Sequence, residues 1–359
     1  MSTYTGNGNT SFKSLAACLA VATLGLLALP ATAPAKKPAS LYWGVQMGTQ
    51  LTPLPPPYEM GGINRFAQVA GKKPSIIAFS VPWADCRVSP CYFFRFPATE
   101  LEKVRRYGAV PFMSWGSQST PSSVTQPDFE LEDIINGTYD LYLQIWAEGA
   151  ADYGHPFFLR FDPEMNGFWF PWSETVNGNS PGEFKAAWRH IHDIFTTYGA
   201  TNVSWVWCPN VDTTGHLANL GRLYPGGRYV DWTCLDGFNW GERRGSPGWL
   251  SFNQIYHSTY KLITKKIAPT KPMIIGEIAS TTKGGNKASW ITDMFKKLRT
   301  TYRKVRGVIW YDVHDRGTNW PIESGSKKVK NAFRRSIRNK AFRPNVFSDI
   351  QAPLNPPQR

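Results

Sequence analysis

Eight short apolar runs, spread over residues 40–313, constrain the fold of this chain more than any other feature. Each run is continuous rather than alternating, which is typical of parallel strands that are covered on both faces. We predict strands within the segments Ser40–Gly48, Ser75–Trp83, Ala109–Ser117, Pro156–Asp162, Val203–Asn210, Val230–Trp240, Lys271–Ser280 and Arg306–Val313.

Amphipathic segments fill several of the gaps between these runs. The pairs Ser180 with Glu183 and Ser251 with Gln254 have the spacing of a capping box, so they predict helix starts. Eight strands alternating with helices over about 300 residues predict an α/β fold, a single (β/α)8 TIM barrel spanning residues 36–343. A doubly wound open sheet is the alternative, but no glycine-rich phosphate loop follows the first run.

Three of the runs have a proline near or just beyond their C-terminal end, namely Pro82, Pro163 and Pro209. A barrel has no edge strands and proline cannot donate a ladder hydrogen bond, so we expect pairing to stop at each of them. Glu164 and Asn210, which follow two of these prolines, would then lie at the C-terminal ends of their strands. That is the face on which barrel enzymes build their active sites.

The first 35 residues have the composition of an export signal. Lys13 precedes the apolar stretch Leu15–Leu29, and small residues follow at Ala33–Ala35. The stretch is short for a membrane-spanning helix, although an uncleaved anchor is the alternative. We therefore expect a secreted protein (extracellular, periplasmic or in the cell wall), with residues 1–35 removed and residues 344–359 forming a proline-rich tail.

Beyond that signal the chain has four cysteines, Cys86, Cys91, Cys208 and Cys234. An even number suits disulfides in an oxidising compartment. The first two would close a short loop and the last two would link neighbouring segments, with free buried thiols as the alternative. No Cys-x-x-Cys or Cys/His cluster suggests a metal site, and we expect no cofactor.

The formal net charge is +14, and basic residues crowd near the C-terminus, among them Lys327, Lys328, Arg334, Arg335 and Arg338. Such a run can contact a polyanion, but it is more often the solvated face of a last helix. Charge alone does not specify nucleic acid, so we expect no nucleic-acid partner, no membrane partner after signal removal, and a monomer.

Two glutamates stand near strand ends. Glu164 follows the fourth run, and Glu277 lies after four apolar residues and a glycine in the seventh. In an eight-stranded barrel these strands face each other across the mouth, and two facing carboxyl groups suit glycoside hydrolysis. The alternative for each is an ion pair with a core arginine, for which Arg160 is close in sequence to Glu164.

The segment "RFDPEMNGFWFPW" resembles the acid/base motif of glycoside hydrolase family 26, the clan A barrels that include β-mannanases. "KPMIIGEIAS" is similar to the nucleophile strand of that family, and "DWTCLDGFNWG" and "GVIWYDVHDRGTNWPIES" resemble its sixth and eighth strands. The resemblance implies that Glu164 is the general acid/base, that Glu277 is the nucleophile, and that the mechanism is retaining. Pro163 replaces the family's histidine and Phe238 replaces its tyrosine, so two polar contacts of the family are missing here.

Further residues are candidates for substrate binding. Aromatic rings can stack on the apolar face of a sugar, and polar side chains can orient it, although packing inside the protein is the alternative for each. Arg160 could orient either glutamate or pair with Asp162 or Asp236. The candidates for substrate binding are Arg160, Asn166, Trp169, Trp172, Trp240, Trp310 and Trp320.

The sequence thus predicts a secreted, retaining endo-glycosidase that acts on a β-linked polysaccharide, nominally mannan. A relative acting on β-1,3-xylan, mixed-linkage glucan or a bacterial exopolysaccharide is an alternative, and a barrel that binds glycans without cleaving them is another. Pro163 and Phe238 motivate the non-catalytic alternative, whereas the presence of both glutamates argues against it.

Overall fold

The computed structural model of the chain describes residues 41–211, 217–243, 245–314, 317–347 and 354. The export signal predicted for residues 1–35 lies outside these ranges, as does most of the tail predicted for residues 344–359.

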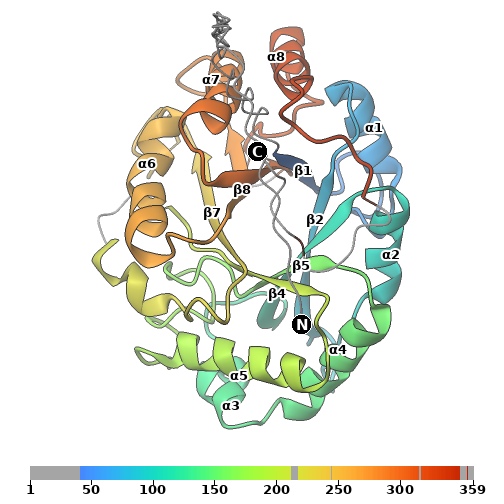
Figure 1. The fold of residues 1–359 in the computed structure, drawn as a ribbon, viewed down its shortest axis with the longest axis vertical. Coiled ribbons are helices and arrows are strands. Elements are labelled where there is room, and N and C mark those ends of the chain that lie inside the picture. Colours follow the sequence, from blue (N-terminus) through green and yellow to red (C-terminus); the bar gives the residue numbers. More distant parts are fainter. Residues whose placement is uncertain (1–40, 212–216, 244, 315–316, 348–353, 355–359) are drawn as a thin grey trace, which may run out of the picture. The chain divides into compact units, whose positions relative to one another are not determined.

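Eight parallel strands close into a barrel (Figure 1). Strand β1 pairs with β9 on one side and with β2 on the other, so the order β1-β9-β8-β7-β6-β5-β4-β2 returns to its start. The barrel strands are β1 (Tyr42–Met47), β2 (Ile76–Asp85), β4 (Val110–Thr120), β5 (Phe157–Phe161), β6 (Val203–Trp207), β7 (Trp232–Asn239), β8 (Met273–Ser280) and β9 (Val305–Asp312). A short strand, β3 (Tyr92–Phe93), pairs antiparallel with the end of β2. This arrangement confirms the predicted (β/α)8 barrel.

Helices lie outside the barrel, between successive strands (Figure 1). They are α1 (Gly61–Ala70), α2 (Ala98–Arg106), α3 (Leu131–Ile135), α4 (Asp140–Tyr153), α5 (Glu183–Thr197), α6 (Phe252–Leu262), α7 (Lys287–Thr300) and α8 (Lys327–Ile337). Among the described residues, no helix combines the length and the apolar character that crossing a membrane requires.

Two predicted helix starts have different outcomes. The capping box of Ser251 and Gln254 is formed in both directions at the start of α6, as predicted. The start predicted at Ser180 is wrong, because α5 begins at Glu183, after Gly182. Gly182 has a φ of 104°, which lies outside the helical region, although the Glu183 carboxylate still accepts a hydrogen bond from the Ser180 N–H at 2.6 Å.

The prolines mark strand ends in two of three cases. Strands β5 and β6 stop just before Pro163 and Pro209, as predicted. The prediction for Pro82 is wrong, because β2 continues to Asp85. The pairing of β2 with β4 changes register between Pro82 and Ala84, and this irregularity accommodates a residue that has no N–H.

Buried side chains form two clusters. The larger one packs the strands against the surrounding helices. The smaller one combines alternate residues of the strands with Phe347 and Leu354 of the C-terminal tail, so it fills the inside of the barrel. The indole N–H of Trp232 donates to the Leu354 carbonyl at 2.9 Å, and the Tyr42 ring lies 5.1 Å from that of Phe347. Phe347 and Leu354 therefore pack at the end of the barrel at which β1 and β7 begin, opposite the end that carries Glu164.

The two disulfides and the basic last helix agree with the pairings and the helix that the sequence suggested. Cys86 is bonded to Cys91, and Cys208 to Cys234. Helix α8 buries its apolar residues, and its lysines and arginines lie on the more exposed side. The basic run is therefore the solvent-facing side of the last helix.

Candidate active site

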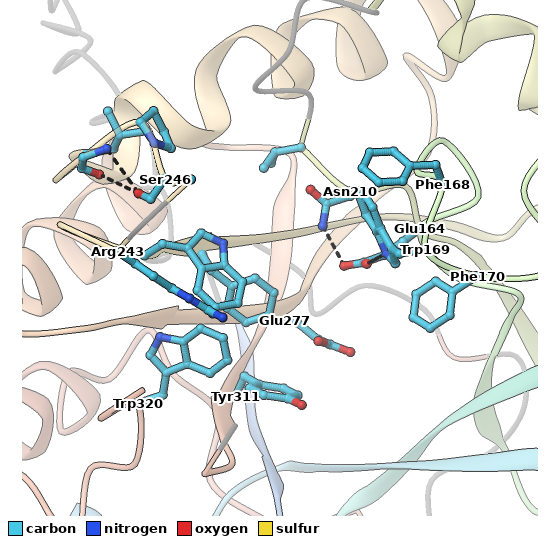
Figure 2. A pocket seen from close by; sticks show the side chains of 17 residues that line it. Glu164, Phe168, Trp169, Phe170, Asn210, Arg243, Ser246, Glu277, Tyr311 and Trp320 are labelled. Atoms are coloured by element: carbon cyan, nitrogen blue, oxygen red, sulfur yellow. Dashed lines mark hydrogen bonds between the residues drawn. The ribbon is translucent and has the colours of Figure 1, made fainter. Parts of the chain in front are cut away.

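Two glutamates, from strands that are separated by two others in the barrel, meet in one cavity (Figure 2). Glu164 lies just after β5, and Glu277 lies within β8. One carboxylate oxygen from each of Glu164, Glu277 and the buried Asp236 falls within 4.8 Å of the other two. The barrel closure therefore brings together the two acids that the sequence singled out, which are 113 residues apart (277 minus 164).

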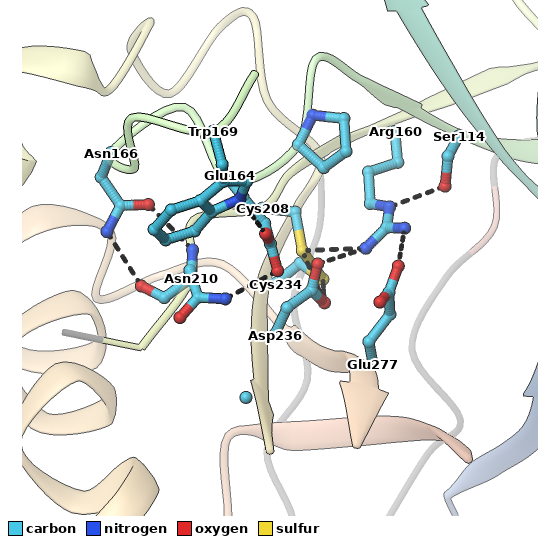
Figure 3. Close-up of polar contacts among 12 residues, drawn as sticks. Ser114, Arg160, Glu164, Asn166, Trp169, Cys208, Asn210, Cys234, Asp236 and Glu277 are labelled. Carbon is cyan, nitrogen blue, oxygen red and sulfur yellow. Dashed lines mark hydrogen bonds and ion pairs between the residues drawn. A yellow bond between two sulfur atoms is a disulfide. The ribbon is translucent and has the colours of Figure 1, made fainter. Parts of the chain in front are cut away.

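Glu164 is held from two sides. The side-chain amide of Asn210 donates to one carboxylate oxygen at 2.7 Å, and the indole N–H of Trp169 donates to the other at 2.6 Å (Figure 3). Burial raises the pKa of Glu164 to about 7, and the charge of Glu277 adds to this, while the two hydrogen bonds and Arg160 oppose it. Glu164 is therefore partly protonated near neutral pH.

Glu277 is paired with a cation. The guanidinium of Arg160 contacts the Glu277 carboxylate at 2.5 Å and also forms an ion pair with Asp236. Its Nε donates to the Ser114 hydroxyl at 2.8 Å (Figure 3). The Arg160 side chain is 1% exposed, so the charge that faces Glu277 is shielded from water. Of the partners that the sequence left open for Arg160, Glu277 and Asp236 are the ones it pairs with.

The strand that carries Glu277 passes very close to its neighbours. A Cβ atom at Gly276 would lie 2.5 Å from the Cys234 sulfur and 2.7 Å from an Asp236 oxygen. Only glycine fits there, and the pairing of β8 with both of its neighbours changes register at this point. Gly276 thus allows the disulfide, Asp236 and Arg160 to pack directly behind Glu277.

The cavity that contains both glutamates has a volume of about 540 Å³. Phe168, Trp169 and Phe170 lie on the side of Glu164, and Trp320 and Tyr311 lie on the opposite side, with Glu277 between them (Figure 2). A second cavity of about 420 Å³ lies over the ends of β1 and β9 and beside Phe79 and Ser80 of β2, and Tyr311 lines both cavities. The two hollows together leave room for a substrate longer than one sugar unit.

The predicted tryptophans separate into two groups. Trp169, Trp240 and Trp320 line the first cavity. Trp172 and Trp310 do not line it, so the cavity gives no support to their predicted role in substrate binding. Trp172 stacks on Phe170 inside the loop that follows β5. Trp310 points outward from β9, because its ring packs edge-on against Phe333 of α8 at 5.6 Å.

The side chain of Asn166 does not line the cavity but bonds to the backbone of Asn210. Its side-chain amide donates to the carbonyl of Asn210 at 3.0 Å, and its oxygen accepts the N–H of Asn210 at 2.9 Å. It therefore fixes the backbone of the residue that donates to Glu164. The contact of Asn166 with substrate stays a prediction.

Several residues that line the cavity are not predicted from the sequence. Asn210 was identified at a strand end but not as the partner of Glu164. Tyr311 follows Trp310 on β9 and takes the inward position in its place. The guanidinium of Arg243 lies 4.9 Å over the Trp240 ring within the cavity. The alternation of side chains along a strand could have identified Tyr311, but no pattern in the sequence places Arg243.

Phe238, at the position where the sequence resemblance leads one to expect tyrosine, forms part of the apolar wall. Its ring stacks on Trp320 with 4.7 Å between centroids and an angle of 16°. Arg160 already supplies positive charge to Asp236 and Glu277, so these acids have a counter-ion within the protein. The arrangement can position a sugar ring between apolar walls with one partly protonated acid and one ion-paired carboxylate beside it.

A model of glycosyl hydrolase family 26 matches residues 108–312 of the chain. The chain is 34% identical over 300 residues to Endoglucanase H of Acetivibrio thermocellus, covering 82% of this chain and 30% of that protein. It is 28% identical over 131 residues to the β-1,3-xylanase TXYA of a Vibrio species, covering 33% of this chain and 26% of that protein. The chain thus spans less than a third of either relative's own length.

Solved structures with the same fold include three mannanases. The match to a GH26 β-mannanase from Bacteroides ovatus has a TM-score of 0.62 at 16% identity and covers 88% of this chain and 94% of that chain. A double mutant of the Cellulomonas fimi endo-β-1,4-mannanase has a TM-score of 0.62 at 18% identity, with coverages of 87% and 73%. The Bacillus subtilis mannanase BCman has a TM-score of 0.57 at 17% identity, with coverages of 86% and 87%. At these identities the likeness shows the shared barrel.

Proposed function

Since the chain belongs to glycosyl hydrolase family 26 and is a glycoside hydrolase, we propose that it cleaves β-linked polysaccharides internally and with retention of configuration. In this proposal Glu164 is the general acid/base and Glu277 is the nucleophile. The observation that carries it is the meeting of these two carboxyl groups, in different environments, in one aromatic-walled cavity.

The separation of the carboxyl groups supports retention. Retaining enzymes place the two groups about 5–5.5 Å apart, whereas inverting enzymes separate them by about 6.5–9.5 Å to admit a water molecule. Oxygens of Glu164 and Glu277 lie within 4.8 Å of each other, which fits the shorter class.

Their charge states support the division of roles. The raised pKa of Glu164, about 7, leaves a proton for the departing glycosidic oxygen. The Glu277 carboxylate, which is ion-paired with the Arg160 guanidinium, attacks the anomeric carbon. In the second step Glu164, now a carboxylate, takes a proton from water as that water displaces Glu277 from the sugar. The proton taken up restores Glu164, and the sugar leaves with its original configuration.

The first substrate we propose is a β-glucan. Endoglucanase H, which matches 82% of this chain, is 34% identical to it in sequence. The mannanases that share the fold are 16–18% identical to it. The match to Endoglucanase H covers 30% of that protein, so mannan, which the sequence resemblance suggests, and β-1,3-xylan stay in the proposal as further backbones. The two adjoining cavities support action within a chain rather than at its end.

We also propose that the protein is exported. The two disulfides are typical of proteins in oxidising compartments, such as the space outside the cell. Polymeric glycans are found there too. An exported enzyme meets such a polymer directly, whereas a protein confined to the cytosol would not.

The experiment is a panel of mixed-linkage β-glucan, β-1,4-mannan and β-1,3-xylan, assayed by the release of reducing ends. Wild type should release oligosaccharides from at least one of them. Glu277→Ala should be inactive on all. Glu164→Ala should retain activity on aryl glycosides with activated leaving groups, and azide should accelerate its turnover. Binding without product from wild type would contradict the proposal. Azide rescue of Glu277→Ala that gives a glycosyl azide of retained configuration would reverse the two roles.

A further inference from the structure

The backbone that carries Glu164 is strained. Asp162 has a φ of 40° and Glu164 a φ of 57°, on either side of Pro163. Left-handed conformations are unfavourable for residues other than glycine, and they persist where the surroundings hold them. The turn from residue 162 to 164 therefore depends on contacts from its neighbours.

The peptide unit between Pro163 and Glu164 is held at both of its ends. The indole N–H of Trp172 donates to the Pro163 carbonyl at 2.8 Å. The N–H of Glu164 donates to the carbonyl of Cys208 at 2.7 Å. Fixing both ends of a planar unit fixes its orientation and so limits the backbone conformations that Glu164 can adopt. The direction of the Glu164 side chain toward Asn210 follows from this.

Trp172 is itself locked in place. It is 2% exposed and stacks on Phe170 with 4.5 Å between centroids and an angle of 12°. A Cβ atom at Gly116 of β4 would lie 2.9 Å from the indole, so the ring packs directly on the strand backbone. The hydrogen bond to Pro163 thus comes from a group that cannot move away without opening the barrel wall.

A second anchor holds the other side of the turn. Asp162 is fully buried, and its two carboxylate oxygens accept hydrogen bonds from the N–H and the hydroxyl of Ser117, each at 2.7 Å. Its own N–H donates to the Trp115 carbonyl at 3.0 Å. Both anchors connect the strained turn to β4 or to the ring packed on it.

We propose that Trp172 and Ser117 are positioning residues for Glu164, which keep the strained turn in the one conformation that aims its carboxyl group at the glycosidic oxygen. The proposal rests on the proposed role of Glu164 as general acid/base. It assigns to Trp172 a role in proton transfer without contact with substrate. Pro163 has no N–H with which to anchor the turn itself, which gives these two contacts their importance.

The test compares leaving groups in Trp172→Phe, which removes the N–H donor and keeps an aromatic ring. Dinitrophenolate departs without a proton, whereas phenolate needs one. For phenyl β-cellobioside, or the mannobioside if wild type prefers mannan, kcat/KM should fall about tenfold or more, because general acid catalysis is weakened. For the 2,4-dinitrophenyl glycoside of the same sugar, kcat/KM should stay within about twofold of wild type.

Trp188→Phe is the matched control. Trp188 is equally buried, and its indole N–H also donates to a carbonyl, that of Tyr229 at 3.1 Å, but it lies on α5 away from the cavity. It should lower both rates alike or neither. Ser117→Ala, which deletes only the hydroxyl, is a second variant and should reproduce the selective loss if Trp172→Phe does not fold.

The outcomes separate this inference from the proposed function. If Glu164→Ala loses phenyl and dinitrophenyl glycosides equally, the role of Glu164 is wrong and the inference falls with it. If Glu164→Ala is selective but Trp172→Phe and Ser117→Ala behave like Trp188→Phe, the role of Glu164 stands and the inference is overturned. Selective loss in either variant supports it.

Discussion

Replacing Arg160 with methionine should strongly destabilise the barrel. Arg160 is 1% exposed and faces Asp236, which is 0% exposed, and Glu277, which is 15% exposed. Methionine fills much of the same space but leaves two acids without a cation. Removing one partner of a buried ion pair typically lowers the free energy of unfolding by about 3–5 kcal/mol. With an unfolding entropy of about 2.1 cal/mol/K per residue and about 310 residues, the melting temperature should drop by about 5–8 °C.

The assay is urea unfolding followed by tryptophan fluorescence, with a melting curve as a second measurement. Arg87→Met is the matched control, because Arg87 also pairs with an aspartate at 2.5 Å but its side chain is 67% exposed. It should leave the free energy of unfolding unchanged within error. Adding Asp236→Asn and Glu277→Gln to Arg160→Met should recover most of the loss, because the uncompensated charges are gone.

The loss should also depend on pH in a defined direction. Burial raises the pKa of Asp236 well above its usual value, and Arg160 opposes this. Without Arg160 the folded-state pKa rises further, so the ionised form is penalised only in the folded state. The deficit of Arg160→Met relative to wild type should therefore shrink as the pH falls through the raised folded-state pKa of Asp236, because the acid is then protonated in both folded proteins. A deficit that grows on acidification would refute this reasoning.

Three other predictions address catalysis, binding and the disulfides. For wild type, kcat/KM should fall as the pH rises past about 7, because Glu164 loses its proton. Asn210→Ala should move this fall in kcat/KM to higher pH, because the hydrogen bond from Asn210 favours the carboxylate form of Glu164. A fall at the same pH as in wild type would contradict the role of Glu164 as the general acid. Trp240→Ala should raise KM for polysaccharide about tenfold with little change in kcat, and a fall in kcat alone would argue against a binding role. Replacing Cys208 and Cys234 by alanine opens a loop of separation 26 and should cost about 3.5 kcal/mol in denaturant unfolding, against about 2 kcal/mol for the other disulfide, of separation 5.

The sequence was sufficient to predict the barrel, because parallel strands that are buried on both faces appear as continuous apolar runs. Few other structures require a series of such runs. It was also sufficient to single out Glu164 and Glu277, because an acid at the end of an apolar run is conspicuous. The pairing of Arg160 could be narrowed to a few acids but not decided. That choice depends on the β8 irregularities beside Gly276, which only three-dimensional packing reveals.

The structure differs from the expectation where the direction of a side chain matters rather than its identity. Trp310 and Tyr311 are adjacent on β9, so a difference of one residue exchanges the inward and outward positions. Trp172 lies in an irregular loop, in which no periodicity indicates the direction of a ring. Pro82 lies at a register change within a strand, which sequence patterns do not indicate. Asn166 was expected to contact sugar, and its side chain bonds to the backbone of Asn210.

The central claim is that Glu277 forms a covalent bond to the sugar while Glu164 moves the proton. The most direct measurement is the intact mass and peptide map of the enzyme after reaction with a 2-deoxy-2-fluoro glycoside that carries an activated leaving group. Slow turnover of the covalent species is expected because fluorine disfavours the charge that develops in the transition state. We expect one added fluorosugar, located on the peptide that contains Glu277 and at Glu277 itself. An adduct on another residue, or none while the matching substrate is hydrolysed with inversion, would contradict it.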